Sequence, residues 1–259
     1  RGERVMTPAR DLHIGSCRLI LGDALAVLPT LGAQAALCLT DPPYPLTSGG
    51  ARTGELGGCL GRAVYDNSGR LFETVPWEAM ARPIFAALAP NANAVVMTND
   101  RQMGAARAAF EAAEFGFHRL LVWNKGGATP NRYYRQTCEF ALFLYKGRAR
   151  TITNPGDSAL MYVPHQDVSQ HFAGSVGVAH PTEKPVTLME RWIENSTDSG
   201  GVVIDPFMGS GSTLVAAAQR GRRAIGIEKD PHWFEMACAR VTAAVTQTQE
   251  RLDFDRIPA

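Results

Sequence analysis

The sequence lacks any apolar run long enough to cross a membrane. A membrane helix requires about 18 consecutive apolar residues, and Arg, Asp, Asn or Gly interrupts every run before that length, as at Asn99–Gln102. The first ten residues also lack the apolar core of a signal peptide. We therefore expect a cytoplasmic protein with no membrane partner.

Cysteine pairs are absent as well. The five Cys residues stand at positions 17, 38, 59, 138 and 238, and no two of them form a CxxC motif. This spacing excludes a disulfide framework and a zinc site built from four thiolates, and we predict no metal site. We expect Cys17, Cys38 and Cys138 to be buried and inert, because they lie in apolar runs.

The sequence also has little excess of charge of either sign. Its 26 basic and 25 acidic residues give a net charge of +1, which argues against a protein that coats nucleic acid by bulk electrostatics. A polyanion must then be bound by a local patch. Only four basic residues are Lys and 22 are Arg, a bias that suits phosphate and guanine contacts but that a GC-rich genome also produces.

What the sequence does contain is an alternation of short apolar runs with helix-like stretches over residues 1–259. Seven runs predict strands: Cys17–Leu21, Ala35–Thr40, Ala94–Thr98, His118–Trp123, Glu139–Tyr145, Val202–Ile204 and Ala224–Ile227. Five stretches predict helices: Trp77–Leu88, Gln102–Ala113, Val186–Asn195, Thr213–Arg220 and His232–Thr246. Runs that end repeatedly in Asp, Asn, Gly or Pro are typical of a mostly parallel α/β sheet.

Two stretches lack periodicity. Pro45–Gly69 contains seven Gly residues, and Arg148–Ala179 follows a predicted strand. A loop of this length inside a compact domain is uncommon unless it acts as a lid or is disordered. We predict one single domain. Pro45–Gly69 would be a Gly-rich loop, either a lid or a tolerated insertion, and Arg148–Ala179 would be a second insertion.

The first candidate site follows the predicted strand Ala35–Thr40. The chain continues directly into Asp41-Pro42-Pro43-Tyr44, at the end of the strand where α/β sheets bind their ligands. The prolines fix φ, so the Pro42 carbonyl lies close to the Asp41 carboxylate. Together these acceptors could hold both hydrogens of an exocyclic amine while Tyr44 stacks on a flat heterocycle. A strand-to-loop turn with a capping Asp is the alternative.

The second candidate site follows Val202–Ile204. Here Asp205–Thr213 forms a Gly-rich turn between a strand and a helix, which lets a ligand approach the backbone. Glu228 ends the next strand, where it can accept hydrogen bonds from a ribose diol. A nicotinamide dinucleotide site has a similar pattern, but Leu214 stands where its third Gly belongs, and no Lys follows the glycines as a P-loop requires.

These motifs together resemble the beta class of DNA amino-methyltransferases that use S-adenosylmethionine. DPPY at 41–44 precedes DPFMGSGST at 205–213, the circularly permuted order of that class. Further agreement comes from Gly22-Asp23, Leu121–Lys125, Glu139–Gly147, His180–Pro185 and Ile227–Asp230. The resemblance spans about Arg18 to Val241 and implies a seven-stranded, mostly parallel, Rossmann-like methyltransferase sheet with helices on both faces.

The resemblance also implies roles for the site residues. Catalysis would fall to Asp41, Pro42, Pro43 and Tyr44. The cofactor would contact Asp23, Ala24, His180, Thr182, Glu183, Lys184, Pro185, Phe207, Gly209, Ser210, Gly211, Ser212, Thr213, Glu228 and Lys229. Double-stranded DNA would be the partner, with Arg148–Ala179 as a small target-recognition insertion. A homodimer and a cognate restriction nuclease are further partners that the sequence leaves open.

DNA contacts are predicted from basic and aromatic residues in loops. These candidates are Arg52, Arg62, Arg132, Tyr133, Tyr134 and Arg135. Solvated surface loops are the alternative for the whole set. A target amine inside a duplex is stacked and paired, so its nucleotide must be flipped out before transfer.

Several functions stay open from the sequence. DPPY resembles the N6-adenine enzymes, whereas N4-cytosine enzymes more usually begin the motif with Ser. An RNA or protein methyltransferase would generally place the cofactor motif first, and a dinucleotide oxidoreductase would leave DPPY unexplained. A catalytically silent DNA-binding homologue would be expected to lose Asp41 or the glycines, and this chain keeps both.

Overall fold

A computed structural model describes residues 10–45, 73–126, 134, 136–164 and 183–254. Its strands are β1 Arg10–Ile14, β2 Cys17–Leu21, β3 Ala35–Thr40, β4 Leu88–Thr98, β5 Gly116–Asn124, β6 Cys138–Tyr145, β7 Leu160–Tyr162, β8 Val202–Asp205 and β9 Arg223–Glu228. Its helices are α1 Ala24–Val27, the 3-10 turn η1 Leu28–Thr30, α2 Trp77–Ala87, α3 Met103–Ala112, α5 Val186–Ser196, α6 Ser212–Gln219 and α7 Pro231–Phe254. None of these helices has the length and apolarity that a membrane span needs.

The strands form one nine-stranded sheet in the order β1-β2-β9-β8-β3-β4-β6-β5-β7. Neighbouring strands are parallel from β2 through β4, and β5 is parallel to β7. The pairs β1–β2, β4–β6 and β5–β6 are antiparallel. The sheet is therefore mostly parallel, as predicted.

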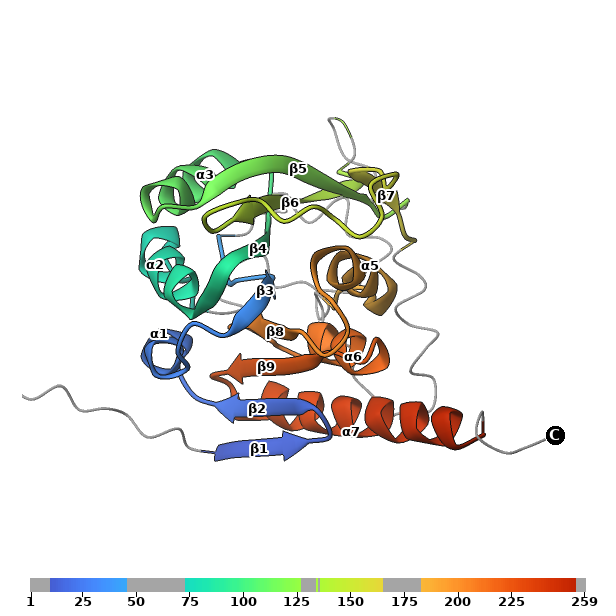
Figure 1. Cartoon of the computed structure of the whole chain (residues 1–259). Coiled ribbons are helices and arrows are strands. Elements are labelled where there is room, and N and C mark those ends of the chain that lie inside the picture. The colour runs from blue at the N-terminus through green and yellow to red at the C-terminus, as the bar shows by residue number, and fades with distance from the viewer. Residues whose placement is uncertain (1–9, 46–72, 127–133, 135, 165–182, 255–259) are drawn as a thin grey trace, which may run out of the picture.

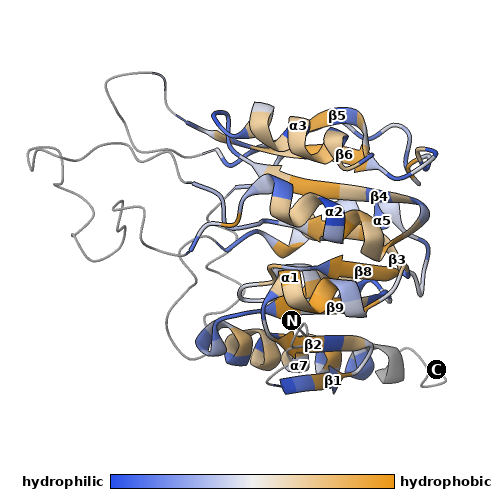
Figure 2. Cartoon of the chain, turned by 90° about the vertical axis from the view of Figure 1, so that its left-hand side faces the viewer, coloured by the Kyte–Doolittle hydropathy of each residue, from blue (hydrophilic) through white to orange (hydrophobic). Residues whose placement is uncertain are grey.

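Helices cover both faces of the sheet. Figure 1 shows α1, α2 and α3 on one side and α5, α6 and α7 on the other. Each face has its own apolar core: one is packed around Trp77, Ile84 and Phe110, and the other around Trp123, Trp192 and Phe234. Figure 2 shows the apolar residues concentrated in the strands between these layers. Strands buried on both faces explain why the sequence shows continuous apolar runs rather than alternation.

All seven predicted strands are present, but the predicted count of seven is wrong. β1 pairs with β2 as an antiparallel edge, and β7 adds three residues beside β5. Both were missed because they are short and mostly exposed, so their apolar content is low. The strand predicted at Ala94–Thr98 begins earlier, at Leu88, which pairs with Ala35 of β3 before a shift in register.

Helix ends also differ from the prediction. The last helix runs Pro231–Phe254 rather than His232–Thr246, and α1 after Gly22 was not foreseen. Asp23 caps α1 by accepting the amide hydrogen of Leu25 at 2.8 Å. Four residues are too few to show a helical period, which is why the sequence pattern gave no sign of this helix.

The sheet topology creates a crevice between β3 and β8. From β8 the chain crosses through α6 to β9, and from β3 it crosses through α2 to β4, in the opposite direction along the sheet. The helices α6 and α2 lie on opposite faces (Figure 1). The carboxyl ends of β3 and β8 thus flank the switch point, where ligands bind in open α/β sheets.

Candidate active site

Asp41 lies one residue beyond β3, at the switch point. Its Oδ2 is 2.5 Å from Nζ of Lys184, and its side chain is 26% exposed. Its Oδ1 is buried and has no hydrogen-bond partner among the described residues. Burial raises the pKa of Asp41, although Lys184 opposes the rise. A buried carboxylate oxygen without a donor is costly, so this atom marks a place for a ligand N–H.

The rest of the tetrapeptide is held rigidly. The Pro42 carbonyl accepts the amide hydrogen of Tyr44 at 2.9 Å, and the Pro43 carbonyl accepts that of Val75 at the same distance. Tyr44 is only 7% exposed, and its ring stacks on Trp77 with centroids 5.6 Å apart. Burial and the nearby carboxylates of Asp41 and Glu139 raise the pKa of Tyr44 well above its usual range, so its hydroxyl stays neutral.

The Gly-rich turn joins β8 to α6. Gly209 and Gly211 both have positive φ, 50° and 83°, which favours residues without a Cβ. The amide of Gly211 donates to the Met208 carbonyl at 2.7 Å, which closes the turn. Thr213 lies in the first turn of α6 with its side chain buried.

Arg240 of α7 holds this turn by hydrogen bonds to Ser210. Its guanidinium donates to the Ser210 carbonyl and Oγ at 2.7 and 2.5 Å, and it forms a buried ion pair with Glu183 at 2.5 Å. The Ser212 hydroxyl lies at 3.4 Å. Glu183, Ser210 and Ser212 were predicted as cofactor contacts, and here their side chains contact Arg240. Sequence reasoning missed Arg240, because α7 contains no motif that links it to the turn.

Four predicted cofactor residues, Asp23, Ala24, Glu228 and Lys229, lie at or just beyond the ends of β2 and β9. The Glu228 carboxylate accepts the amide hydrogens of Gly209 and Asp230 at 2.9 and 2.8 Å, and burial raises its pKa. The Gly22 amide donates to the Glu228 carbonyl at 2.8 Å, which brings Asp23 and Ala24 beside it. Lys229 is exposed, and its side chain pairs with Glu73 at 2.7 Å.

Asp41 and the Gly-rich turn line one small cavity of about 70 Å³. Its walls are Asp41, Glu183, Lys184, Met189, Asp205, Phe207, Met208, Gly209, Ser210, Ser212 and Thr213. Two motifs that are 160 residues apart in the chain therefore meet at one point. Pro185 directly precedes the neighbouring helix α5, and Met189 of α5 lines the cavity.

Asp205 is a buried carboxylate in this wall that the sequence analysis did not single out. Its Oδ1 accepts the Thr40 hydroxyl at 2.7 Å and the Phe207 amide at 3.2 Å. Burial raises the pKa of Asp205 to about 6. The bond from Thr40 ties the end of β3 to the end of β8, so Asp205 holds the two halves of the site together.

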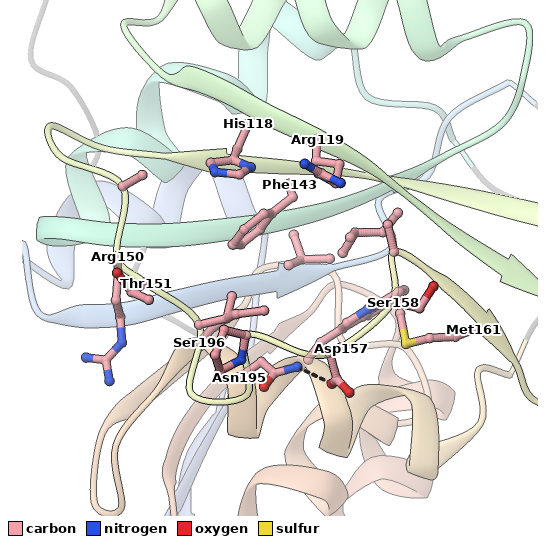
Figure 3. A pocket seen from close by; sticks show the side chains of 17 residues that line it. His118, Arg119, Phe143, Arg150, Thr151, Asp157, Ser158, Met161, Asn195 and Ser196 are labelled. Carbon is pink, nitrogen blue, oxygen red and sulfur yellow. Dashed lines mark hydrogen bonds between the residues drawn. The ribbon is translucent and has the colours of Figure 1, made fainter.

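A larger cavity of about 380 Å³ lies elsewhere. Figure 3 shows it between His118, Arg119 and Phe143 of the sheet, the segment 149–161, and the end of α5 at Asn195 and Ser196. This is the start of β5 and the end of α5, opposite the edge where Asp41 lies. No residue predicted for catalysis or cofactor binding lines it, although part of the predicted target-recognition insertion does. Its larger size does not make it the active site, because neither Asp41 nor Pro42, the two predicted acceptors of the target amine, lines it.

Several predicted residues lie outside the described residues. They are His180, Thr182, Arg52, Arg62, Arg132, Tyr133 and Arg135, with most of Pro45–Gly69 and the second half of Arg148–Ala179. Tyr134 is described and is fully exposed. The described first part of the insertion, 148–164, contains β7 and lines the larger cavity.

Comparison with known proteins gives matches along most of the chain. YubD of Escherichia coli (strain K12) is 32% identical over 236 residues, which cover 90% of this chain and 93% of YubD. TTHA0409 of Thermus thermophilus, solved with S-adenosyl-L-methionine, is 26% identical with a TM-score of 0.59 and covers 87% of this chain and 94% of that one.

The PvuII DNA methyltransferase, described as cytosine-N4-specific, shares the fold at 15% identity with a TM-score of 0.68, over 95% of this chain and 96% of its own. The model of the N6_N4_Mtase family, described as DNA methylase, matches residues 35–239, which include both Asp41 and the Gly-rich turn. The chain belongs to this family of DNA methylases.

Proposed function

We propose that the protein transfers a methyl group from S-adenosylmethionine to the exocyclic N6 amine of adenine in DNA. The observation that carries this proposal is the unpartnered Oδ1 of Asp41, which lines one cavity with the Gly-rich turn after β8. An acceptor for an amine and a turn for a cofactor meet there. Methyl transfer between two bound molecules needs this juxtaposition.

S-adenosylmethionine is the cofactor that suits this family and this site. Gly209 has a positive φ and lines the cavity, which fits a ligand lying against the turn, whereas the missing side chain of Gly211 makes room for Ala237 of α7. Phe207, Gly209 and Gly211 would hold its methionine portion, Glu228 its ribose and Asp23 its adenine. When bound, it supplies an electrophilic methyl group on a sulfonium. Phe207 and Gly209 line the cavity beside Asp41, which brings the proposed cofactor site next to the proposed acceptor.

The residues of the chain act on the target amine. Asp41 Oδ1 and the Pro42 carbonyl accept its two N–H bonds, which aligns the nitrogen lone pair for in-line attack. Burial of this pair replaces water by fixed acceptors, and such positioning accounts for most of the expected acceleration. Because Tyr44 packs one ring face on Trp77, only its other face or its edge can contact a flipped base.

Adenine N6 and cytosine N4 are both exocyclic amines, and the two acceptors would serve either. The DPPY sequence at 41–44 resembles adenine enzymes, so N6 is our proposal and N4 of cytosine is the second candidate. A silent DNA-binding homologue is disfavoured because Asp41 and both glycines are present.

The remaining features of the proposal concern organisation. The neighbouring positions of N-terminal β2 and C-terminal β9 support a circularly permuted, beta-class arrangement in one domain. Double-stranded DNA is the proposed partner, contacted by the loop arginines and by Arg148–Ala179, in the cytoplasm. A homodimer or a cognate nuclease of a restriction-modification pair would be compatible with this arrangement.

The decisive experiment incubates the protein with labelled S-adenosylmethionine and unmethylated genomic DNA, and then identifies the labelled nucleoside. N6-methyldeoxyadenosine is expected, and N4-methyldeoxycytidine would replace the first proposal by the second. Asp41→Ala should abolish transfer while calorimetry shows cofactor affinity within a few fold of the parent. Transfer at the parent rate by Asp41→Ala would disprove the role of Asp41.

A further inference from the structure

Four charged side chains form a partly buried chain of contacts that ends at Asp41. Nζ of Lys184 lies 2.5 Å from Oδ2 of Asp41 and 3.5 Å from Oε2 of Glu139. Nζ of Lys125 lies 2.8 Å from Oε1 of Glu139. Lys184 is the least exposed of the four at 11%, between two carboxylates. We name this set, Asp41, Lys184, Glu139 and Lys125, the charge quartet.

The charge quartet gathers residues from four segments at one edge of the sheet. Asp41 follows β3, Lys125 follows β5, Glu139 is the second residue of β6, and Lys184 precedes α5. Two carboxylates and two ammonium groups sum to zero charge. A partly buried charge is stabilised by a partner of opposite sign, and each side chain of the quartet contacts at least one such partner.

The pKa shifts of Glu139 and Lys184 agree with this balance of charge. Burial alone would raise the pKa of Glu139, but Lys184 and Lys125 outweigh it and hold the pKa at about 2. Burial would lower the pKa of Lys184, but Asp41 and Glu139 outweigh it and raise the pKa above its usual range. At neutral pH, Lys184 is therefore a fixed positive charge held by Glu139.

We propose that Lys184 is a positioning residue for Asp41, and that Glu139 and Lys125 hold Lys184 in place. This inference rests on the proposed function of Asp41 as the acceptor of the target amine. Lys184 occupies Oδ2 and so leaves Oδ1 as the one carboxylate oxygen that faces a ligand. The carboxylate plane is thereby fixed, and the Lys184 ammonium opposes the rise that burial gives to the pKa of Asp41. Lys184 acts on the amine side of the reaction rather than on the cofactor.

Removal of the Lys184 charge should raise the pKa of Asp41 further, because burial and Glu139 would then act on it without the opposing ammonium. A protonated Asp41 cannot accept an amine hydrogen through that oxygen as a carboxylate does. Among the described residues, the other titratable or charged groups around Asp41 are Tyr44, Glu139, Glu183 paired with Arg240, and Asp205. None of these groups can replace Lys184, since Arg240 is engaged with Glu183 and Ser210.

The test compares Lys184→Gln and Lys184→Arg with the parent in single-turnover transfer to DNA across pH, with calorimetric titration of S-adenosylmethionine. We expect Lys184→Gln to lose roughly 100-fold in rate at pH 7.5, with cofactor affinity within about 3-fold, because misplacement of a reacting group costs about that much. The acid limb of its pH profile should move to higher pH. Lys184→Arg should restore the limb while recovering only part of the rate.

A matched control removes the same charge elsewhere. Arg107→Gln breaks an exposed pair with Glu111 on α3 and should leave rate, affinity and pH profile unchanged. Glu139→Gln keeps the shape of the side chain and, by releasing Lys184, should also lower the rate without lowering cofactor affinity. Glu139→Gln keeps the inference testable where Lys184→Gln does not fold.

A readout independent of transfer is the ionisation of Asp41 itself. With ¹³C-labelled aspartate carboxyls, the Asp41 signal, assigned through Asp41→Asn, should titrate at higher pH in Lys184→Gln than in the parent. Loss of cofactor affinity in proportion to rate would overturn the inference and return Lys184 to the cofactor. An unchanged Asp41 titration would overturn it too. A parent protein that methylates no DNA would instead defeat the proposed function, while the titration still tests the charge quartet.

Discussion

Asp205 carries the clearest pH dependence at the scale of single residues. Its pKa is about 6 in the folded protein, against 3.8 as the ordinary value, because it is buried. The folded state therefore binds a proton between about pH 4 and pH 6 that the unfolded chain has released. The free energy of unfolding must then fall as pH rises through this window, by about 2–3 kcal/mol for this one group.

Asp205→Asn keeps an acceptor for Thr40 and Phe207 but cannot titrate. We expect its thermal midpoint to depend less on pH between 4 and 6 than that of the parent. Other raised carboxyls, such as Glu228, cancel in this difference because both proteins contain them. Parallel midpoint curves for the two proteins would contradict the assignment.

The buried pair of Glu183 and Arg240 gives a second prediction at this scale. Both side chains are at most 8% exposed, so removing one partner strands the other charge. Arg240→Met should lower the free energy of unfolding by about 3–5 kcal/mol. Adding Glu183→Gln to Arg240→Met should recover a large part of that loss, as urea denaturation would measure. An additive second loss would show that the pair is not coupled.

The catalytic and cofactor turns could be predicted from the sequence because each is a short local motif that follows an apolar run. The contacts that hold them could not. Arg240 is 30 residues from Ser210, Thr40 is 165 residues from Asp205, and Lys184 is more than 140 residues from Asp41. Such pairs are set by strand order in the sheet, and no local pattern encodes them.

At the scale of elements, β9 packs closely against the Gly-rich turn because Gly226 has no side chain. A Cβ on Gly226 would lie 2.3 Å from Sδ of Met208 and 2.7 Å from Cδ2 of Leu214. Met208 precedes Gly209, and Leu214 belongs to α6, so one added methyl group would push on both ends of the turn.

Gly226→Ala should therefore cost about 1–3 kcal/mol of stability through overpacking, and should weaken cofactor binding by moving the turn. Gly104→Ala is the matched control in α3, where a Cβ meets nothing within 4 Å. That change should be neutral or stabilising by up to about 1 kcal/mol, as expected for Gly to Ala in a helix. Urea denaturation of both variants decides this, and equal stabilities would refute the packing argument.

The positions of seven strands could be predicted because buried strands have strong apolar runs, but the number of strands in the sheet was wrong. The two missed strands lie at the edges, β1 and β7, where exposure removes that signal. The charged residues Arg10 and Asp11 in β1 are typical of an edge strand that must not pair with another chain.

At the scale of the whole molecule, strand order and chain order disagree. β8 and β9 come from the last quarter of the chain, yet they lie in the middle of the sheet between β2 and β3. Many of the residue contacts therefore join distant parts of the sequence, and proteins of that kind fold slowly. We expect refolding from urea to be slow, on the order of seconds, when followed by the fluorescence of the buried Trp residues; refolding in under a millisecond would contradict this.

The same strand order has a consequence for synthesis on the ribosome. After Thr40 leaves the ribosome, another 188 residues must follow before Glu228 completes β9, about 10–40 s at ordinary rates of translation. Throughout that interval the inner edges of β2 and β3 have no partner, and their apolar side chains are open to chaperones and proteases. Nascent chains stalled at residue 199 should therefore be cut readily by a protease that spares the folded protein, and this sensitivity should disappear once β9 has been made and can pair with β2 and β8.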